Sequence, residues 1–290
     1  MGRKLRKTGL HPFLTFLFSA LLVVYILIPF AWLFISAISP KIELSAVPPH
    51  WFPRNPSFDN FTKLLGNENL AISSGETPRF GTAMRNSLIV SLGANLMCLV
   101  IGIFAAYAFS RLRFRLKNAF FMTIIAIRML PEIALVLPLY MIMRKLGMAD
   151  SKVFMTIVYA SFILPFVIWI LKSYFDSIPA SLEEAALIEG AGRFAIIINV
   201  VLPLAMPGII ATCIFSVLTA WDEFLFALIF TSTYRSKTLT VAISEFTTRH
   251  MVDYGMMCAG GVLAALPPVL IALFLQKYIV SGLSEGGVKE

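Results

Sequence analysis

Two long apolar stretches of the sequence are each interrupted by a pair of ionisable residues. Arg128 and Glu132 flank Pro131 in one stretch, and Asp222 and Glu223 stand together in another. Charge within a membrane-spanning segment is costly, so it usually marks a solute pathway or a paired contact. Arg128 and Glu132 are four residues apart, so on a helix they share a face and can neutralise each other.

Aromatic residues surround the second pair, with Trp221 before it and Phe224 and Phe226 after it. Carboxylates beside aromatic faces suit a sugar, because carboxylates accept hydrogen bonds from hydroxyl groups while rings cover apolar surface. Structural alternatives stay open: an ion pair at a helix kink for the first pair, and an interface anchor or a subunit contact for the second. The predicted solute pathway comprises Arg128, Glu132, Trp221, Asp222 and Glu223, with Asn95 as a further pore-lining residue.

The elements that carry these residues belong to a membrane protein. The 290 residues are 58% hydrophobic and 14% charged, with a mean hydropathy of +0.83, which is more apolar surface than a soluble core of this length buries. Spanning segments must be helices, because a helix satisfies its own backbone hydrogen bonds in lipid. We predict an all-α polytopic protein with a six-helix domain at 13–280, short ends at 1–12 and 281–290, and spans at 13–37, 86–110, 119–143, 153–175, 204–230 and 257–280.

Basic residues lie at the edges of these spans. The net charge of +8 therefore indicates membrane orientation and lipid contact rather than nucleic-acid binding. A cluster at 3–7 and the connector 111–117 both favour the cytoplasm, and an even number of spans then places both termini inside. Segments 38–85, 144–152 and 231–256 are then external.

The polar loop at 176–203 has a structure of its own. Ser181, followed three residues later by Glu184, is a capping-box pattern that starts a short helix. Gly190 favours a helix end, and residues 194–201 are apolar enough for a second short helix along the membrane face. The sequence therefore predicts a helix, a turn and a helix that project from the bundle toward another protein.

This loop resembles the EAA loop of permease subunits in ABC importers. The family pattern is E-A-A, three residues, G, nine residues and I-x-L-P, and Val200 stands in place of the isoleucine. Glu189 stands where sugar permeases often have aspartate, and Asp222 where asparagine is usual. The positions that meet the pattern are Glu184, Ala185, Ala186, Gly190, Leu202 and Pro203.

Similarity to maltose-type carbohydrate permeases, specifically the shorter of the two permease subunits, extends over nearly the whole chain. It rests on Arg128, Met129 and Pro131 with Pro138, Leu139 and Tyr140; on Trp221 with Glu223, Phe224 and Leu225; on Asp253, Tyr254 and Gly255; and on the ending 276–289.

The resemblance implies a type I ABC importer permease that works by alternating access. Its EAA helix would act as a coupling helix that docks in a cleft of a cytoplasmic ATPase subunit, with Glu184 pairing with a basic residue there and Gly190 allowing the sharp turn. Glu184 can also cap its own helix, and both roles can hold at once. The tail at 281–289 either reaches the ATPase interface or is a disordered end.

The implied partners are a second, homologous permease subunit, two ATPase subunits and an extracytoplasmic substrate-binding protein. The binding protein would meet the external loop at Glu245, Arg249 and Asp253, although an ordinary polar hairpin explains that loop as well. ATP and Mg²⁺ would belong to the ATPase partners, because this chain has no G-x-x-x-x-G-K-[ST] motif. We predict no cofactor and no metal in the chain itself, and a multi-pass location in the cytoplasmic (inner) membrane of a prokaryote.

Two other classes of protein compete with this interpretation. An intramembrane hydrolase would need a nucleophile with a base, or a metal cluster, and the spans offer neither. An ion-coupled secondary sugar transporter could use Glu132, Asp222 or Glu223 as a proton relay, but six spans with a docking loop fit the usual inverted repeats poorly. We therefore predict a transport subunit, not an enzyme, for a sugar or sugar-like solute such as an oligosaccharide, polyol or sugar derivative.

Overall fold

The structure is a computed structural model of the chain, and it describes residues 10–46, 50–66, 80–247 and 252–285. These residues are mainly helical, and an isolated bridge between Thr247 and Val252 is the one β pairing among them. The predicted all-α fold is therefore confirmed. The chain divides into two compact units, one within Met1–Thr77 and Ile243–Ala265, the other within Pro78–Ala242 and Leu266–Glu290.

The first unit carries an apolar helix with the length and composition of a membrane span. Most large side chains of this helix are exposed, as expected for side chains that face lipid. The chain then folds back on the helix end, where the Asn60 side chain donates a hydrogen bond to the Ala37 carbonyl oxygen at 2.8 Å. The helices of this unit are α1 (Leu10–Ile38), α2 (Lys41–Leu44), α3 (Asp59–Leu65) and the part of α14 (Tyr254–Glu285) that ends at Ala265.

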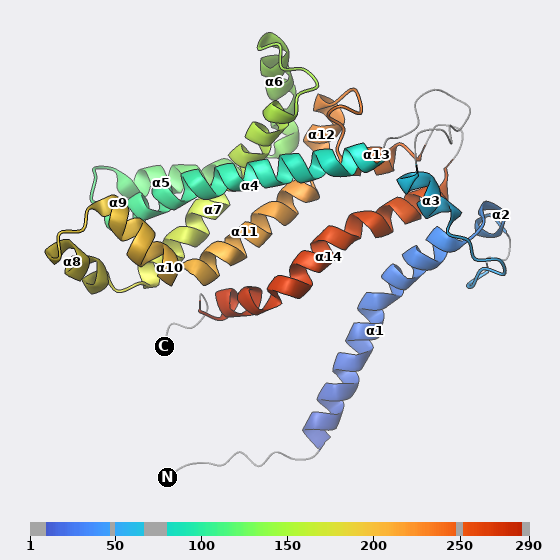
Figure 1. Ribbon diagram of the computed structural model, residues 1–290, viewed down its shortest axis with the longest axis horizontal. Helices are drawn as coiled ribbons and strands as arrows, with labels where there is room; N and C mark the ends of the chain where they lie inside the picture. Colours follow the sequence, from blue (N-terminus) through green and yellow to red (C-terminus); the bar gives the residue numbers. More distant parts are fainter. Residues whose placement is uncertain (1–9, 47–49, 67–79, 248–251, 286–290) are drawn as a thin grey trace. The chain divides into compact units, whose positions relative to one another are not determined.

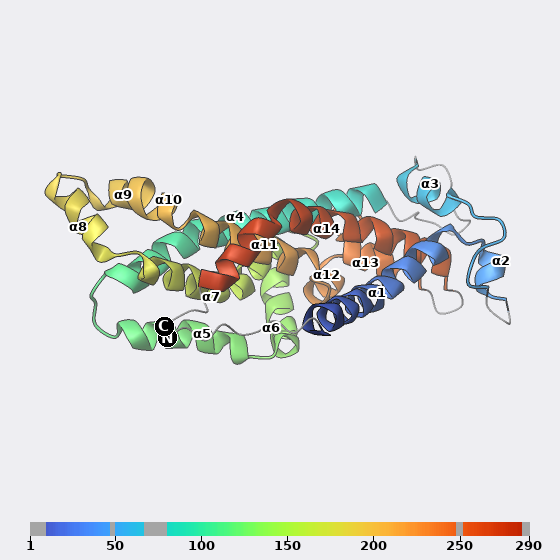
Figure 2. The same cartoon turned by 90° about the horizontal axis from the view of Figure 1, so that it is seen from below.

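The second unit is built on three helices that run side by side, α4 (Phe80–Arg111), α7 (Lys152–Ser177) and α11 (Met206–Trp221), as Figures 1 and 2 show. Shorter elements connect these helices. They are α5 (Lys117–Ala126), the 3₁₀ turn η1 (Ile127–Met129), α6 (Glu132–Lys145), α8 (Ala180–Ile188), α9 (Arg193–Ile196), the π-helical turn η2 (Ile197–Val201), α10 (Leu202–Leu204), α12 (Leu225–Phe230) and, up to Ala242, the first part of α13 (Leu239–Ser244).

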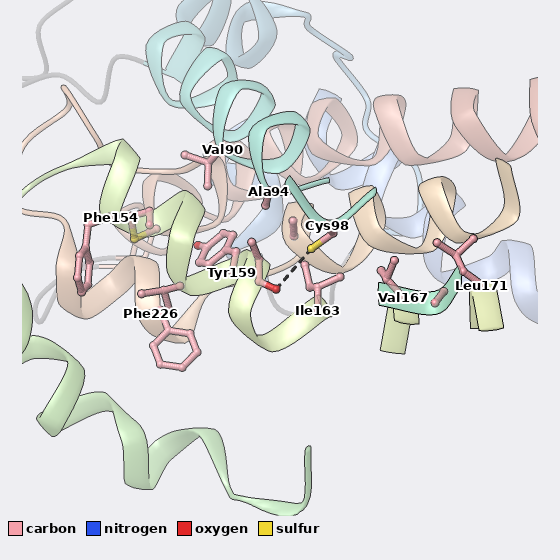
Figure 3. Close-up of a cluster of buried hydrophobic side chains, with 14 of the residues drawn as sticks. Val90, Ala94, Cys98, Phe154, Tyr159, Ile163, Val167, Leu171 and Phe226 are labelled. Atoms are coloured by element: carbon pink, nitrogen blue, oxygen red, sulfur yellow. Dashed lines mark hydrogen bonds between the residues drawn. The ribbon is translucent and has the colours of Figure 1, made fainter. Parts of the chain in front are cut away.

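The core of the second unit lies between α4 and α7. Ala94 and Cys98 of α4 pack against Tyr159 of α7, and the Cys98 thiol donates a hydrogen bond to the Ala160 carbonyl oxygen at 3.4 Å (Figure 3). Small residues let two helix backbones approach closely, which is how membrane helices commonly pack. In the described part of the chain the three cysteines, Cys98, Cys213 and Cys258, are free thiols.

Four helices among the described residues are long and apolar enough to cross a membrane: Pro12–Ile38, Phe80–Arg111, Lys152–Ser177 and Tyr254–Gln276. They overlap the first, second, fourth and sixth predicted spans. The other two predicted spans, 119–143 and 204–230, are not single helices. Two helix pairs bent by 96° and 81° occupy most of these regions, Lys117–Met129 with Glu132–Lys145 and Arg193–Leu204 with Met206–Trp221, so the described residues hold four spans, or up to six if each bent pair is one.

Proline and a short polar segment account for the breaks. Leu130 and Pro131 both have extended backbone with ψ of 127°, because proline disfavours helical geometry in the residue before it and lacks an N–H for the helix. The bend before α11 falls at Ala205, two residues before Pro207. A second interruption at 222–224 ends α11 and separates it from α12.

Two glycines set the spacing of α7 against its neighbours. A Cβ added to Gly102 of α4 would lie 2.6 Å from Cγ1 of Val167, and one added to Gly208 of α11 would lie 2.3 to 2.6 Å from ring atoms of Tyr174. Both distances are far shorter than a carbon–carbon contact allows. Side chains at these positions would therefore push the helices apart.

We expect the substitution Gly208→Ala to destabilise the protein by about 1–3 kcal/mol, because the new methyl group overpacks the contact between α7 and α11. Gly81→Ala is the matched control, since nothing lies within 4 Å of its added Cβ on α4. Thermal unfolding of the detergent-solubilised protein measures both. Equal melting temperatures for the two variants would show that Gly208 does not set this spacing.

Candidate functional site

The loop with the E-A-A pattern folds as the short helix α8, which lies with α9 and α10 at the end of the second unit that also holds the α4–α5 connection (Figures 1 and 2). A glycine turn closes this helix. Gly190 has a φ of +87°, and its N–H donates to the Leu187 carbonyl at 3.0 Å while the Ala191 N–H donates to the Ala186 carbonyl at 2.9 Å. Left-handed glycine with these two bonds is the Schellman helix end, so the predicted turn at Gly190 is confirmed.

A buried ion pair fastens α8 to the end of α4. Glu183 is 6% exposed, and its carboxylate accepts hydrogen bonds from Arg111 Nε at 2.5 Å and from the Tyr107 hydroxyl at 2.9 Å. Arg111 also donates from Nη2 to the Ile178 carbonyl oxygen at 2.8 Å, just before α8 begins. Charges paired away from water attract each other strongly, so these contacts hold α8 against α4. We call Tyr107, Arg111 and Glu183 the α8 anchor.

The same end of α4 is joined to the end of α7. The Ser110 hydroxyl donates to Asp176 at 2.6 Å, and Lys172 pairs with the other carboxylate oxygen of Asp176 at 2.5 Å. Arg111 donates from Nη1 to the Ser110 hydroxyl at 3.1 Å. The ends of α4, α7 and α8 therefore meet in one continuous polar network.

The predicted capping box of Ser181 and Glu184 is wrong. The helix begins one residue earlier, at Ala180, with Pro179 as its N-cap residue and no side-chain cap. Proline has the fixed φ that suits a helix start, and the Leu182 N–H closes the first turn on the Pro179 carbonyl at 3.3 Å. Glu184 is left exposed, and its carboxylate makes no hydrogen bond or ion pair within the described chain.

Sequence reasoning gave the chemistry of this loop to Glu184 and missed its neighbour Glu183. Neighbouring residues on a helix point about 100° apart, so Glu184 and Ala185 are exposed while Glu183 is buried and Ala186 is half-buried. The sequence holds one hint that Glu183 faces inward: Glu183 and Ala186 are three residues apart, so they share a face of the helix. The partner of Glu183, Arg111, is 72 residues away. The sequence indicated for Arg111 only a role in membrane orientation.

The residues that follow α8 pack along α4. The rings of Phe104 and Phe194 stack with centroids 6.2 Å apart. The predicted second helix at 194–201 is present as α9 followed by the π-helical turn η2. Leu202 is half-buried against the core and Pro203 is exposed, just before the bend that leads into α11.

A cavity of about 330 Å³ lies where both broken regions meet α7. Arg128 and Glu132 line it from the break between η1 and α6, and Asp222 and Glu223 line it from the break between α11 and α12. Tyr159 of α7 adds its side chain to the wall. The structure thus brings the two predicted charged pairs, which are far apart in sequence, to one cavity.

The charged groups of this cavity make different contacts. Both oxygens of the Glu223 carboxylate accept hydrogen bonds from backbone N–H groups in the first turn of α12, at 2.7 and 3.2 Å, so Glu223 caps that helix. Arg128 donates to the Phe162 carbonyl oxygen at 2.8 Å. The described residues contain no ion pair between Arg128 and Glu132. The 96° bend removes the shared helical face that the sequence interpretation assumed.

Two further predicted pathway residues do not line the cavity. Asn95 of α4 is 7% exposed, and its side-chain nitrogen donates to the Cys213 sulfur at 3.1 Å. Trp221 ends α11 and is 4% exposed. Both side chains are buried between packed helices. Tertiary packing decides which face of a helix lines a cavity, and the sequence does not show that face.

A carboxylate that the sequence did not single out organises the loop before α13. Asp150, at a φ of +57°, accepts hydrogen bonds from the N–H groups of Ser232 at 2.8 Å and Thr233 at 3.1 Å, and from the hydroxyls of Thr233 and Ser236. Burial acts to raise the pKa of Asp150, but these donors stabilise the carboxylate and hold its pKa below the ordinary value.

The start of α4 fastens the same loop. The Asn86 side-chain nitrogen donates to the carbonyl oxygens of Tyr234 and Lys237, both at 3.0 Å, and its oxygen accepts from Lys152 at 3.1 Å. The loop at 231–238 is therefore held on two sides.

The three residues predicted to contact a binding protein precede α14 in the sequence. Glu245 is half-buried. Asp253 accepts a hydrogen bond from the Met256 N–H at 3.0 Å and pairs with Lys41 at 3.8 Å, so it has a local role in starting α14. Arg249 lies outside the described residues.

Apolar helices of spanning length and a cavity lined by four charged side chains are features of a membrane transport protein. Residues 98–285 match the family described as binding-protein-dependent transport system inner membrane component, and the chain belongs to this family. It is therefore a permease component of an ABC importer in the inner membrane, not an enzyme. The predicted resemblance is confirmed, and the ion-coupled alternative is set aside.

Relatives and solved structures agree over the length of the chain. The diacetylchitobiose uptake system permease protein DasC of Streptomyces coelicolor is 32% identical, covering 93% of this chain and 95% of the relative. The trehalose/maltose transport system permease protein MalG of Thermococcus litoralis is 31% identical, covering 98% and 99%. A chain of a bacterial ABC transporter involved in alginate import superposes with a TM-score of 0.75 at 21% identity, covering 96% of this chain and 99% of that one.

We expect Glu183→Gln to destabilise the protein by up to about 3–5 kcal/mol, because removing one partner of a buried ion pair leaves the other charge uncompensated. Glu184→Gln, one residue along on the exposed side of α8, should change stability by no more than about 0.5 kcal/mol. Thermal unfolding in detergent compares these two isosteric changes. If both variants melt like the wild type, the α8 anchor contributes nothing to stability.

The contact made by Asp150 should depend on pH. Its pKa is lowered in the folded state, so its stabilising contribution is complete above the ordinary carboxyl pKa of about 3.9 and is lost as pH falls through the lower folded-state value. Asp150→Asn should therefore cost about 1–2 kcal/mol at pH 7, and the difference from the wild type should shrink in acid. Melting curves from pH 7 to pH 3 measure this, with Asp59→Asn on the exposed start of α3 as control. A difference that grows in acid would contradict the assignment.

Proposed function

We propose that this chain is one of two permease subunits of an ATP-driven importer for a sugar or sugar-like solute, such as an oligosaccharide, polyol or sugar derivative. One observation carries the proposal: α8 turns Glu184 and Ala185 outward while Glu183, on its inner face, is fastened to α4. An exposed carboxylate on a rigidly held helix suits a contact with a basic group of another protein. The printed names of the relatives, which refer to diacetylchitobiose and to trehalose and maltose, support a carbohydrate solute.

The coupling mechanism follows from the contacts of α8. An ATPase subunit that holds ATP and Mg²⁺ would receive α8, and two such subunits would serve the two permease chains. A displacement of α8 would reach α4 through Arg111 and Glu183, and α11 through the packed segment α9 to α10. Such a packed and hydrogen-bonded chain can carry a two-state movement. The residues to which we assign the contact and its turn are Glu184, Ala185, Ala186, Gly190, Leu202 and Pro203.

We propose that α8 and both chain termini lie on the cytoplasmic side. Arg111, Arg113, Arg115 and Lys117 connect α4 to α5 at the same end of the second unit as α8, and basic connectors favour the cytoplasm. The loop held by Asp150 and the segment with Glu245, Arg249 and Asp253 would then face outward, where an extracytoplasmic binding protein would deliver the solute.

We expect Glu184→Gln to lower ATP-driven uptake and solute-stimulated ATP hydrolysis about tenfold or more, because it removes a charge-assisted contact of roughly 1.5–3 kcal/mol. Gly190→Ala should act in the same direction, because a φ of +87° is strained for alanine. The assay uses the full complex of both permeases, both ATPases and the binding protein in proteoliposomes. Ser181→Ala, exposed on the first turn of α8, should leave both rates unchanged.

Two results would contradict this proposal. Wild-type rates for both the Glu184 and the Gly190 variants would remove the loop from the coupling path. Uptake driven by a proton gradient in liposomes without the ATPase subunits would remove the ATP-driven mechanism altogether.

A further inference from the structure

The cavity between the two broken regions has an unbalanced charge. Three carboxylates, those of Glu132, Asp222 and Glu223, share its wall with one guanidinium, that of Arg128, which leaves a formal excess of two negative charges when all four are ionised. Arg128, Glu132 and Asp222 are exposed and Glu223 is half-buried. A cavity lined mainly by one sign of charge concentrates ions of the opposite sign and repels its own.

Exposed charges at this place need water or a polar solute in front of them. They belong to the bent and interrupted helices of a membrane bundle, and ionisable groups within such bundles face a water-filled cavity or a partner rather than lipid. Irregular backbone at membrane depth is likewise tolerated where it lines a cavity. Both features fit a solute pathway better than a lipid-facing surface.

A buried hydroxyl adds to the polar part of the wall. Tyr159 is 2% exposed and lines the cavity, and its hydroxyl lies beside the Glu223 carboxylate, with which it interacts. The polar groups of this wall are therefore held in place by α7 as well as by the first turn of α12.

Aromatic rings complete the wall. Phe162 and Phe226 stack with centroids 4.9 Å apart, and Phe224 is 40% exposed, all three at the cavity. Ring faces beside a few placed polar groups are typical of pockets for small solutes, and they suit the apolar C–H faces of a sugar ring.

We propose that this cavity binds a solute rich in hydroxyl groups and free of negative charge, and that it discriminates against acidic sugars. The carboxylates of Glu132 and Asp222 accept hydrogen bonds from solute hydroxyls, Arg128 donates to solute oxygens, and the ring faces cover apolar surface. The excess negative charge repels carboxylated, sulfonated or phosphorylated solutes. The inference rests on the proposed function, because it names the class of solute that this permease carries.

Thiol reagents of opposite charge measure the sign of the electrostatic potential in the cavity, and the natural solute need not be known. The full importer, with its three native cysteines replaced, receives Thr219→Cys, because Thr219 is half-buried and lines the cavity. The rate of each reagent with the protein is divided by its rate with free cysteine. On this scale the cationic reagent, trimethylammonium-ethyl methanethiosulfonate, should react at least about tenfold faster than the anionic one, sulfonatoethyl methanethiosulfonate. Glu132→Gln and Asp222→Asn should each reduce this ratio, Arg128→Gln should raise it, and Glu189→Gln on the distant loop should leave it unchanged.

Protection by solutes tests binding itself. Maltotriose, which is neutral, and chitosan disaccharide, which is cationic, should slow the modification of Thr219→Cys, whereas digalacturonate should not. Equal rates for the two reagents, no reaction with or without ATP, no protection by any neutral or cationic solute, or equal protection by digalacturonate would each overturn the inference. Failure of the proposed function is distinguishable, because it would appear as uptake independent of ATP while the reagent ratio and the protection pattern stayed intact.

Discussion

The ion pair between Arg111 and Glu183 decides where α8 can lie. Both side chains are largely removed from water, and the carboxylate has a second donor in the Tyr107 hydroxyl. Such a pair costs much to break, since either charge left alone would stay partly buried. The neighbouring contacts of Ser110 and Asp176 extend the constraint to α7, so three helix ends are fixed around one carboxylate. A loop helix held in this way can transmit a displacement to the bundle rather than absorb it.

Charged side chains inside the second unit are also held by hydrogen bonds to the backbone. Helix breaks put Glu223 where it can cap α12 and put Arg128 where it can reach the Phe162 carbonyl. Glu223 and Arg128 thereby gain local roles, and Glu132 and Asp222 line the same cavity. The packing of α4 on α7 through glycine and alanine supplies the rigid wall behind it. Anchor and cavity lie in one compact unit, so movement of α8 has a physical route toward the cavity.

Much of the fold and part of the candidate site were predictable from sequence. The length of the apolar stretches predicts helices at 13–37, 86–110, 153–175 and 257–280, because in lipid a single segment can form all its backbone hydrogen bonds only as a helix. Gly190 predicts a turn, because glycine readily adopts positive φ. The helix start was misplaced at Ser181, since Pro179 and the backbone hydrogen bonds of the first turn made a side-chain cap unnecessary. The continuous helices expected at 119–143 and 204–230 are broken, because Pro131 and the Asp222–Glu223 pair carry local preferences that outweigh apolar length.

The sequence alone determined that this protein is a helical membrane permease with an E-A-A loop, because hydropathy, glycine and proline act locally and the E-A-A pattern is contiguous. Only the tertiary structure decided which of two adjacent glutamates is buried, because the partner of Glu183 lies 72 residues away on α4. It also decided that Arg128 and Glu132 share a cavity with Asp222 and Glu223 instead of pairing with each other. The 96° bend before α6 and the interruption at 222–224 set those directions, and the angle at a break arises from the packing of distant segments, which spacing along a chain does not encode.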